Sequence, residues 1–360
     1  MPPHTADSPV AAVSPEPVLV RPATLADLPA LLSLASLAGA GLTTLPVDEH
    51  LLRKRVALSV QSFTRLLNAA PETPGTDAYL LVMQTASGRV IGTSGIVAKV
   101  GGFEPFYSYV IETARFESKT IGVARDVPIL RLHEEHDGPC EIGSLFLHPD
   151  FRQSHNGRFL QFVRFLLIAE YPGAFETSVV SEIRGVSDDS GRSPFWDALG
   201  HHFFGIDFRT ADRLSVSNKK FIAELMPDHP IYIPLLPPDA QAVIGAPHPH
   251  SIPAIKNLAG EGFVYQHAVD IFDAGPVYAC PRDKIRSVRL SRRAPVREVV
   301  QSLDTPDFMM CTAAPGFSAT KGPLAETPAG LRISAASAHL LQVRVGEVLR
   351  YVELKNPEAA

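Results

Sequence analysis

The sequence predicts an α/β protein with a mixed sheet, a second α/β stretch and a small β-rich appendage towards the C-terminal end. Apolar runs of strand length alternate with segments in which apolar residues recur at helical spacing, which is typical of a sheet covered by helices. The chain has 360 residues, 45% hydrophobic and 20% charged, which is enough for one large domain and a smaller one. Beyond about residue 290 the sequence becomes rich in Pro, Ala and Ser, and strand-like runs close it.

These observations divide the chain into four parts. Residues 1–17 are rich in Pro, Ala and Ser and lack the basic start and apolar core of a signal peptide, so we expect a disordered tail. Residues 18–210 carry the main α/β pattern. Residues 211–290 form a second α/β region that we expect to complete the active site, and residues 291–360 form the β-rich appendage.

Helix starts and turns in residues 18–210 carry recognisable signals. Thr24 is a candidate N-cap, with Asp27 three residues later and Leu28 and Leu31 on one face of the following helix. Ser87-Gly88 is typical of a hairpin turn. In chain order we expect a strand at 18–22, helices at 24–38 and 48–67, a hairpin of 79–83 and 90–96, a strand at 142–147, a helix over 156–169, a strand at 178–183, a helix at 194–200 and a strand at 202–208.

The later parts of the chain show shorter patterns. We expect helical segments at 220–226, 239–244 and 254–258, followed by apolar strands after Gly262-Phe263. The last strands are expected at 331–334 and 346–354. No internal repeat of fixed period is present.

The overall charge and the cysteines exclude several classes of protein. The formal net charge is −5, which leaves no electrostatic footprint for nucleic acid or an anionic membrane surface. No apolar run approaches the length that spans a bilayer. Cys140, Cys280 and Cys311 are widely separated and lack C-x-x-C spacing, which argues against a disulfide framework and a zinc site. We therefore expect a cytoplasmic protein without a metal or redox cofactor, and without nucleic-acid or membrane partners.

The most informative stretch lies between Ile142 and Leu160. An apolar run ends at Pro149, a polar turn follows, and apolar residues then recur at helical spacing. A strand, a tight loop and a helix in succession bring backbone N–H groups and the positive end of a helix dipole to one point, which suits a pyrophosphate. Arg152 and Arg158 flank this point and add charge-assisted hydrogen bonds. The alternative is an ordinary strand–helix connection with a solvated arginine.

The loop Arg152-Gln-Ser-His155-Asn156-Gly157 resembles the acyl-CoA loop of the GNAT acyltransferases, Arg/Gln-x-x-Gly-x-Gly/Ala. His155 stands where that superfamily usually has Gly. The resemblance implies a GNAT-like core in which Arg152, Asn156, Gly157 and Arg158 contact acyl-CoA, and the expected order of strands and helices is that of a GNAT domain.

Over residues 18 to about 290 the chain also resembles the arginine N-succinyltransferases, which open the bacterial succinyl route of arginine catabolism. The resemblance implies succinyl-CoA as donor, the α-amino group of L-arginine as acceptor, Leu145 as a donor-binding position and His229 as a proton donor. Relatives occur as two similar subunits, which implies a homo-oligomer or a hetero-oligomer with a related subunit. The likeness rests on the segments Val20–Pro22, Gly41–Pro46, Glu141–Leu147, Asn156–Gly157, Ser193–Trp196, Phe221–Tyr232, Gly262–Phe263 and Asp270–Pro276.

Acyl transfer from a thioester to an amine needs a deprotonated amine, support for the carbonyl oxygen and a proton for the thiolate. A backbone N–H near Leu145, Phe146 or Leu147 would hold the carbonyl oxygen if the strand diverges from its neighbour there. The alternative is that these side chains only belong to the core. His229 precedes Pro230, which favours extended backbone at the end of an element, and the ordinary pKa of imidazole suits proton transfer.

The charges of both substrates need partners. Glu141 and Glu182 are the expected partners of the acceptor's cations, because a carboxylate within apolar strand sequence such as Glu182 needs a partner. The alternative is an internal ion pair of Glu182 with Arg184. For the succinyl carboxylate, Thr43 and Thr44 offer hydroxyl and backbone donors. Arg184 or Arg192 could add a cation there.

The sequence therefore predicts an arginine N-succinyltransferase that works by direct attack in a ternary complex, without a covalent enzyme intermediate. One alternative is a GNAT-like acyltransferase acting on ornithine or on another amine and acyl-CoA. A second alternative is a non-catalytic partner subunit of an active homologue.

Overall fold

The computed structural model describes residues 16–39, 42, 44–102, 104–188, 191–215, 219–312 and 316–355. Residues 1–15 of the expected tail, and Thr43 of the expected donor site, lie outside this part of the chain. The strands are β1 (Val18–Pro22), β2 (Ala78–Thr85), β3 (Val90–Val97), β4 (Phe106–Ser118), β5 (Val123–Glu135), β6 (Cys140–Leu147), β7 (Ser178–Glu182), β8 (Ile231–Tyr232), β9 (Val264–Val269), β10 (Pro276–Pro281), β11 (Arg292–Val300), β12 (Asp307–Thr312), β13 (Ser318–Thr327), β14 (Gly330–Ser334) and β15 (Val348–Glu353). The α-helices are α1 (Leu28–Ala38), α2 (Glu49–Asn68), α3 (Asn156–Glu170), α4 (Pro194–Ala198), α5 (Gly200–Phe204), α6 (Phe208–Ser215), α7 (Lys220–Leu225), α8 (Pro238–Val243), α9 (Ile252–Gly260), α10 (Arg286–Leu290) and α11 (Ala335–Leu341).

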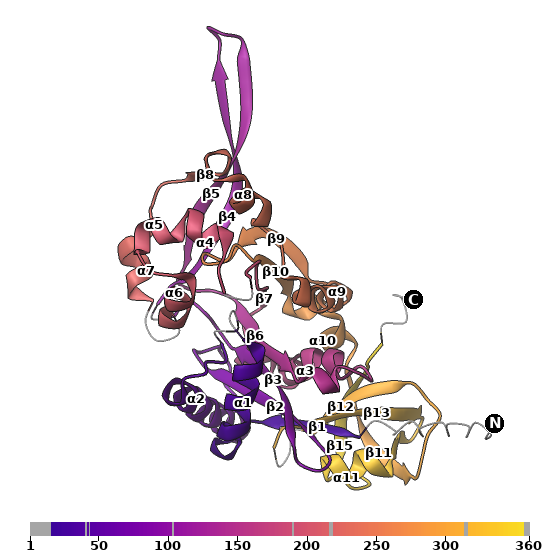
Figure 1. Ribbon diagram of the computed structural model, residues 1–360. Coiled ribbons are helices and arrows are strands. Elements are labelled where there is room, and N and C mark those ends of the chain that lie inside the picture. The colour runs from indigo at the N-terminus through magenta and orange to yellow at the C-terminus, as the bar shows by residue number, and fades with distance from the viewer. Residues whose placement is uncertain are drawn as a thin grey trace, which may run out of the picture.

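Within the described residues, 15 strands join into one mixed sheet, in the order β12-β15-β11-β14-β13-β1-β2-β3-β6-β7-β10-β9-β4-β5-β8. The expected mixed α/β class is confirmed. The order β1, α1, α2, β2, β3, β6, α3, β7 is the GNAT-like succession predicted for the core, interrupted only by the long hairpin of β4 and β5 (Figure 1).

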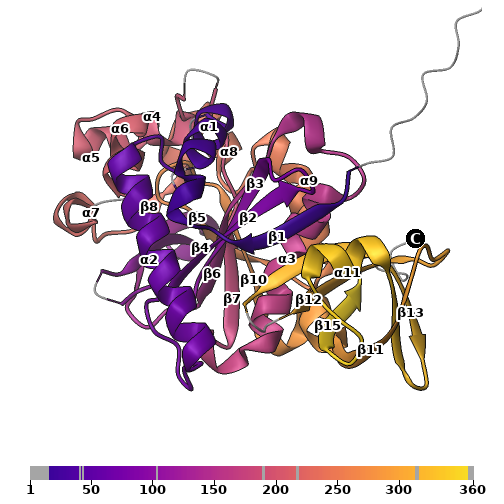
Figure 2. The ribbon, with the colours of Figure 1, turned by 90° about the horizontal axis from the view of Figure 1, so that it is seen from below.

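Helices cover both faces of the core strands. Successive side chains of β2 point to opposite faces of the sheet, as expected for the period of two in a strand. Leu80 and Val82 pack with residues of α1 and α2, whereas Leu81 and Met83 pack in the cluster that contains the apolar side of α3. Figure 2 shows α1 and α2 on one side of these strands and α3 on the other. The site loop before α3 is therefore fixed by a buried helix.

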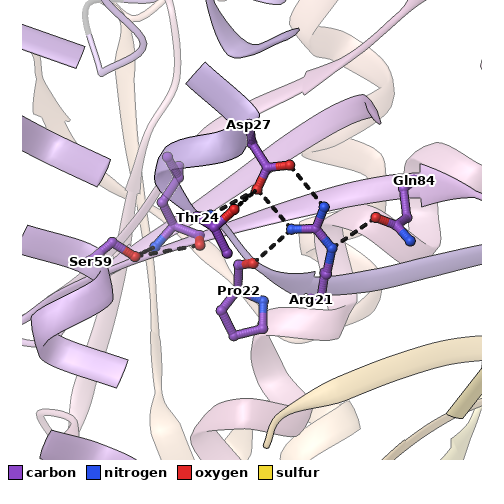
Figure 3. Close-up of polar contacts among 7 residues, drawn as sticks. Arg21, Pro22, Thr24, Asp27, Ser59 and Gln84 are labelled. Atoms are coloured by element: carbon purple, nitrogen blue, oxygen red, sulfur yellow. Dashed lines mark hydrogen bonds and ion pairs between the residues drawn. The ribbon is translucent and has the colours of Figure 1, made fainter. Parts of the chain in front are cut away.

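An ion pair between the half-buried Arg21 and the buried Asp27 joins β1 to the start of α1 (Figure 3). Arg21 donates from Nη1 and Nη2 to the two carboxylate oxygens of Asp27, both at 2.8 Å, and from Nε to Gln84 at 2.8 Å. The backbone N–H and hydroxyl of Thr24 donate to the same carboxylate. Burial disfavours the charged form, but the bonds from Arg21 and Thr24 hold the pKa of Asp27 below its usual value. Thr24 is the N-cap of a short 3₁₀ turn that leads into α1, close to the expected start.

The hairpin of β4 and β5 is among the elements that were not predicted from the sequence. Each residue of Phe106–Ser118 pairs with one of Val123–Glu135, and the outer half projects from the body (Figure 1). Its base joins the sheet through β9 and β8. Charged side chains interrupt the alternation of apolar residues along the outer half, so the hydrophobic pattern of a strand is weak there.

The expected strand at 202–208 is wrong. Residues 200–204 form α5, which ends at Gly205 with φ 65°, and α6 begins at Phe208. The aromatic run looks like a strand, but its rings gather around Trp196: Phe204 stacks on the indole at 5.3 Å and Phe208 lies at 6.4 Å between ring centroids. The strand that pairs with β7 is instead β10, which comes from much later in the chain.

The C-terminal strands extend the same sheet. Strands β11 to β15 and α11 enclose their own apolar cluster, and β13 pairs with β1 through Leu19–Thr320 and Val20–Ala319. Figure 2 shows this unit beside β1. Among the described helices, none is both long enough and apolar enough to cross a bilayer.

Candidate active site

Strands β6 and β7 run parallel and separate after two residue pairs. They pair only at Cys140 with Val179 and at Glu141 with Val180. Beyond Glu141, the described part of β6 has no strand partner on its β7 side. Backbone groups at such a divergence are open to hydrogen bonds with an extended ligand. The divergence lies beside Leu145–Leu147, where the sequence analysis required it.

A β-bulge in β6 lies at this divergence. The pairing with β3 shifts, so that Ser144 and Leu145 lie opposite one residue of β3. Ser144 has φ 51°, a left-handed conformation that is uncommon for a residue other than Gly. Its N–H donates to Oγ1 of Thr44 at 3.1 Å, and its Oγ donates to the Thr44 carbonyl at 3.2 Å. Thr44 therefore supports the bulge.

A buried arginine supports the bulge from the side of α3. Arg164 is 2% exposed, and its Nη1 donates to the carbonyls of Gly143 at 3.1 Å and Gly95 at 3.4 Å. Its Nε donates to the carbonyl of Gln161 at 3.0 Å. These bonds satisfy carbonyls next to the irregular pairing of β3 and β6, so Arg164 is a positioning residue for this part of β6.

The side chains of Leu145, Phe146 and Leu147 pack into the apolar clusters around β6. The core interpretation is therefore correct for their side chains, while their backbone lies at the divergence of the strands. Both roles are compatible, because a strand can bury a side chain and still present its N–H to a ligand.

The loop after β6 leads into the first turn of α3 with several free N–H groups. His155 precedes the helix with φ 60°, the conformation that Gly would adopt without strain. The backbone N–H groups of His155, Gly157 and Arg158 have no acceptor among the described residues. A Cβ on Gly157 would meet only Leu147 Cδ2, at 3.9 Å, so the space in front of this turn is open. The geometry suits a pyrophosphate.

Other residues predicted in this loop have structural partners. The exposed Arg152 donates from Nε to the Leu147 carbonyl at 3.1 Å, and its guanidinium carbon lies 5.7 Å from the Phe146 ring centroid. The buried Asn156 donates from Nδ2 to the Phe151 carbonyl at 3.1 Å. Thus Asn156 shapes the loop, and Arg152 lies against its base.

Basic side chains surround the start of α3. Arg158 donates from Nε to Asn257 of α9 at 3.3 Å, and Lys321 of β13 donates to the carbonyl of Ser154. Burial, together with the positive charges of Lys355, Arg158 and Lys321, lowers the pKa of His155. The loop therefore lies in a positive environment, which favours a bound anion.

A cavity of about 490 Å³ lies beside the divergence of β6 and β7. It is lined by the core strands, by α2, and by elements from the second α/β region. Its lining residues are Thr44, Arg55, Thr76, Gly95, Ile96, Val97, Val100, Gly101, Glu104, Phe106, Tyr107, Glu141, Gly143, Glu182, Asp212, Ser215, Lys219, Ile222, Asp270, Ile271 and Phe272.

Glu141 and Glu182 both line this cavity, as the pairing of their strands requires. Glu141 lies opposite Val180, and Glu182 is two residues further along β7, so both project from the same face of the sheet. Oε1 of Glu182 is inaccessible to solvent and has no hydrogen-bond partner among the described residues. Burial, and then the charges of Asp270 and Glu141, raise the pKa of Glu182 well above its usual value. The alternative, an ion pair of Glu182 with Arg184, is absent from the described contacts, where Arg184 instead donates to Ser187 Oγ at 2.9 Å.

Asp270 adds a third carboxylate to the cavity. Its Oδ1 accepts the N–H groups of Phe272 at 2.7 Å and Asp273 at 2.9 Å, which fixes the side chain at the end of β9. Burial raises the pKa of Asp270, opposed by these bonds and by Lys219. The neighbouring Asp273 is a structural residue, because its two oxygens accept the N–H groups of Gly185 and Gly275. Glu141, Glu182 and Asp270 are called the carboxylate cluster below.

An acidic cavity in the part of the sheet where β6 diverges from β7, together with free N–H groups at the start of α3, suits an acyl-CoA enzyme with a cationic acceptor, and comparisons with known proteins agree with this class of enzyme. Residues 18–287 match the family described as "Arginine N-succinyltransferase beta subunit". The chain belongs to the arginine N-succinyltransferase family. It is 45% identical to the arginine N-succinyltransferase subunit beta of Pseudomonas aeruginosa over 276 residues, covering 76% of this chain and 80% of that protein.

Further relatives cover nearly the whole chain. An arginine N-succinyltransferase of Yersinia pseudotuberculosis is 39% identical over 351 residues, covering 94% of this chain and 98% of that protein. The solved structure of arginine/ornithine succinyltransferase subunit AI from Pseudomonas aeruginosa superposes with a TM-score of 0.85 at 32% identity, covering 95% of this chain and all of that chain. The superposition therefore extends into the C-terminal unit, beyond the residues that match the family description.

His229 of this arginine N-succinyltransferase family member lies outside the cavity lining. It is exposed, in the loop between α7 and β8. Its role as a proton donor stays a prediction.

Several residues of the site were missed from the sequence. Arg55 lies on α2 among other charged residues, and nothing in the spacing separates it from a solvated helix face. Asp270 had a signal, since it directly follows an apolar strand in one of the family segments. Lys219 and Asp212 reach the cavity only through the packing of α6 and α7.

Proposed function

We propose that the protein transfers the succinyl group of succinyl-CoA to the α-amino group of L-arginine. The observation that carries this proposal is the carboxylate cluster in a cavity beside the divergence of β6 and β7. A dication with one carboxylate fits a cavity lined by five acidic residues, three of which form the carboxylate cluster, together with Arg55 and Lys219. Family membership supports the same reaction.

The reaction proceeds by direct attack in a ternary complex. The α-ammonium group first loses a proton, and its nitrogen then attacks the thioester carbonyl carbon. A C–N bond forms, the C–S bond breaks, the nitrogen loses a second proton to become the amide N–H, and the CoA thiolate takes up a proton and leaves as the thiol. A carboxyl group with a raised pKa is suited to accept the first proton, which favours Glu182. For the proton that the thiolate takes up, we propose His229 as the donor, because of the family resemblance.

The donor is proposed to lie along β6. Its pyrophosphate contacts the free N–H groups at the start of α3, and its thioester carbonyl accepts a backbone N–H near Leu145. Succinyl-CoA is a co-substrate, and this reaction uses no metal or redox cofactor. The acceptor is arginine because a guanidinium offers paired donors to a carboxylate, although one relative is an arginine/ornithine succinyltransferase by name.

Release of free CoA thiol tests the proposal. The purified protein is mixed with succinyl-CoA and L-arginine, and thiol release is followed with a chromogenic disulfide. We expect release that depends on both substrates, and N-succinylarginine as the product by mass spectrometry. Comparable release with L-ornithine would make ornithine a natural acceptor. No release with any amine would leave the chain as a non-catalytic partner subunit.

We also propose that the protein assembles with a second copy or with a related subunit through the projecting hairpin. Two relatives are named as subunits. The outer hairpin exposes Phe116 (47%) and Ile121 (72%), and an isolated two-stranded hairpin gains little stability in water. Replacing residues 113–128 with an Asn-Gly turn should convert the assembly to monomer in light scattering without a loss of thermal stability. An unchanged mass would remove the hairpin from the interface.

The proposed location is the cytoplasm. The three cysteines are free and buried, which is compatible with a reducing compartment. Fractionation of the native cells would test this location: we expect the protein in the cytosolic fraction, and recovery in another fraction would contradict it.

A further inference from the structure

Two basic side chains, Arg55 and Lys219, line the cavity. The proposed reaction also involves two carboxylates, one at the end of the succinyl group and one on the amino acid. The two cations lie at different positions in the fold. Their positions indicate which of the two carboxylates each cation would bind.

Arg55 is attached to the strand that carries the donor. Its Nη2 donates to Oγ of Ser144 at 2.9 Å, and Ser144 is the buried bulge residue next to Leu145. The Thr44 bonds hold Ser144 from the other side. The guanidinium is thus fixed beside the point at which the thioester carbonyl would lie.

Arg55 has no carboxylate partner within ion-pair distance among the described residues. A guanidinium has five N–H donors, of which the Ser144 bond uses one. Burial disfavours its charge and lowers its pKa, while the charge of Glu141 acts in the opposite direction. A partly buried guanidinium with unused donors is a site for an anion.

Lys219 lies on the side of the acceptor. It precedes α7, and its positive charge acts on all three members of the carboxylate cluster. A lysine among carboxylates that bind the acceptor's cations is positioned to meet the acceptor's own carboxylate.

We propose that Arg55 binds the terminal carboxylate of the succinyl group and so selects succinyl-CoA over uncharged acyl-CoA donors. This inference rests on the proposed function. The succinyl carboxylate lies three carbon–carbon bonds from the thioester carbonyl, roughly 4 Å, so its partner has to lie next to the residues that hold that carbonyl. Arg55, held on Ser144, meets this requirement. Arg184 and Arg192 do not line the cavity.

The test compares succinyl-CoA with butyryl-CoA, which carries a methyl group in place of the carboxylate. With L-arginine as acceptor, we expect the wild-type ratio of kcat/KM for succinyl-CoA over butyryl-CoA to exceed about 10-fold. In Arg55→Met this ratio should fall close to one. In Arg55→Lys, which keeps the charge but not the paired donors, the ratio should fall less.

Two matched variants separate this role from a structural one. Ser144→Ala removes the anchor of Arg55 but keeps the cation, so it should lower the donor ratio, and by less than Arg55→Met does. Lys219→Met should instead reduce the preference for L-arginine over L-argininamide, and leave the donor ratio near the wild-type value. Circular dichroism and melting temperature establish that each variant is folded.

Failure of this inference differs from failure of the proposed function. If the wild-type protein does not succinylate arginine, the proposed function fails. If it does, an unchanged donor ratio in both Arg55→Met and Arg55→Lys overturns the assignment of Arg55. A loss of preference for arginine over argininamide in Arg55→Met would place Arg55 on the acceptor carboxylate instead.

Discussion

Glu182 combines a buried carboxylate oxygen with two carboxylate neighbours, an arrangement that is unfavourable without a ligand. Its strand neighbours Val180 and Val277 are apolar and pack together. A folded protein that only needed stability would place an apolar or paired side chain here. A cationic acceptor bound in the cavity would compensate this group, so in the proposed function Glu182 links the stability of the site to acceptor binding.

Replacing Glu182 with Gln should stabilise the ligand-free protein at neutral pH and lower kcat/KM for arginine. The folded state raises the pKa of Glu182 above its unfolded value of 4.5, so it binds the proton more tightly than the unfolded chain does. Stability contributed by this group is therefore lost as pH rises above about 4.5 towards the folded pKa. Melting temperatures between about pH 8 and about pH 5 should rise on acidification more in the wild type than in Glu182→Gln. Identical pH profiles would mean that Glu182 carries no perturbed charge.

Replacing His229 with Ala tests the proton donor of the proposed reaction. If imidazole protonates the departing thiolate, kcat should fall by about 10²–10⁴ with a smaller effect on KM. Single-turnover kinetics with succinyl-CoA and arginine measure this step. A kcat near the wild-type value would assign the proton to water and leave His229 as a surface residue.

The connection from β6 to α3 illustrates how irregular backbone prepares a site. Ser144 and His155 both adopt positive φ, on either side of the last residues of β6 and the turn that follows. Such conformations cost about 1–3 kcal/mol each and persist only when surrounding contacts enforce them. Thr44, Arg164 and Asn156 supply those contacts through hydrogen bonds to the backbone.

Replacing Gly157 with Val should raise the KM for succinyl-CoA more than the KM for arginine. The space in front of Gly157 is open in the ligand-free protein, so added bulk is tolerated by the fold but occupies the proposed position of the pyrophosphate. Steady-state kinetics with each substrate varied in turn measure the effect, with circular dichroism as the control. A folded variant with an unchanged donor KM would show that the start of α3 does not bind CoA.

The C-terminal unit contacts the loop of the proposed donor site, although residues beyond 287 lie outside the match to the family description. Strand β13 pairs with β1, which brings Lys321 to the carbonyl of Ser154 in the loop before α3. A segment far along the chain thereby supplies positive charge next to the pyrophosphate position.

Replacing Lys321 with Met should raise the KM for succinyl-CoA several-fold while the KM for arginine changes little. The reason is the loss of a positive charge and of the hydrogen bond that holds Ser154. Because exposed charges are screened by salt, the difference from wild type should shrink at higher ionic strength. The outcome that contradicts this role is an equal effect on both substrates, which would indicate a general loss of the fold.

The sequence by itself determined the α/β class, the strand–loop–helix of residues 142–169, and the two carboxylates Glu141 and Glu182. These follow from hydrophobic periodicity, from turn residues and from charges in apolar strands, all of which are local signals. Only the tertiary structure decided that β10 lies beside β7, that Arg55 and Lys219 face the same cavity, and that Lys321 reaches the start of α3. These contacts join residues far apart in the chain, and a polar side chain on a helix has the same local pattern whether it meets solvent or a ligand. The prediction of a strand at 202–208 was wrong for the same reason, since packing around Trp196 outweighed the preference of its aromatic residues for strands.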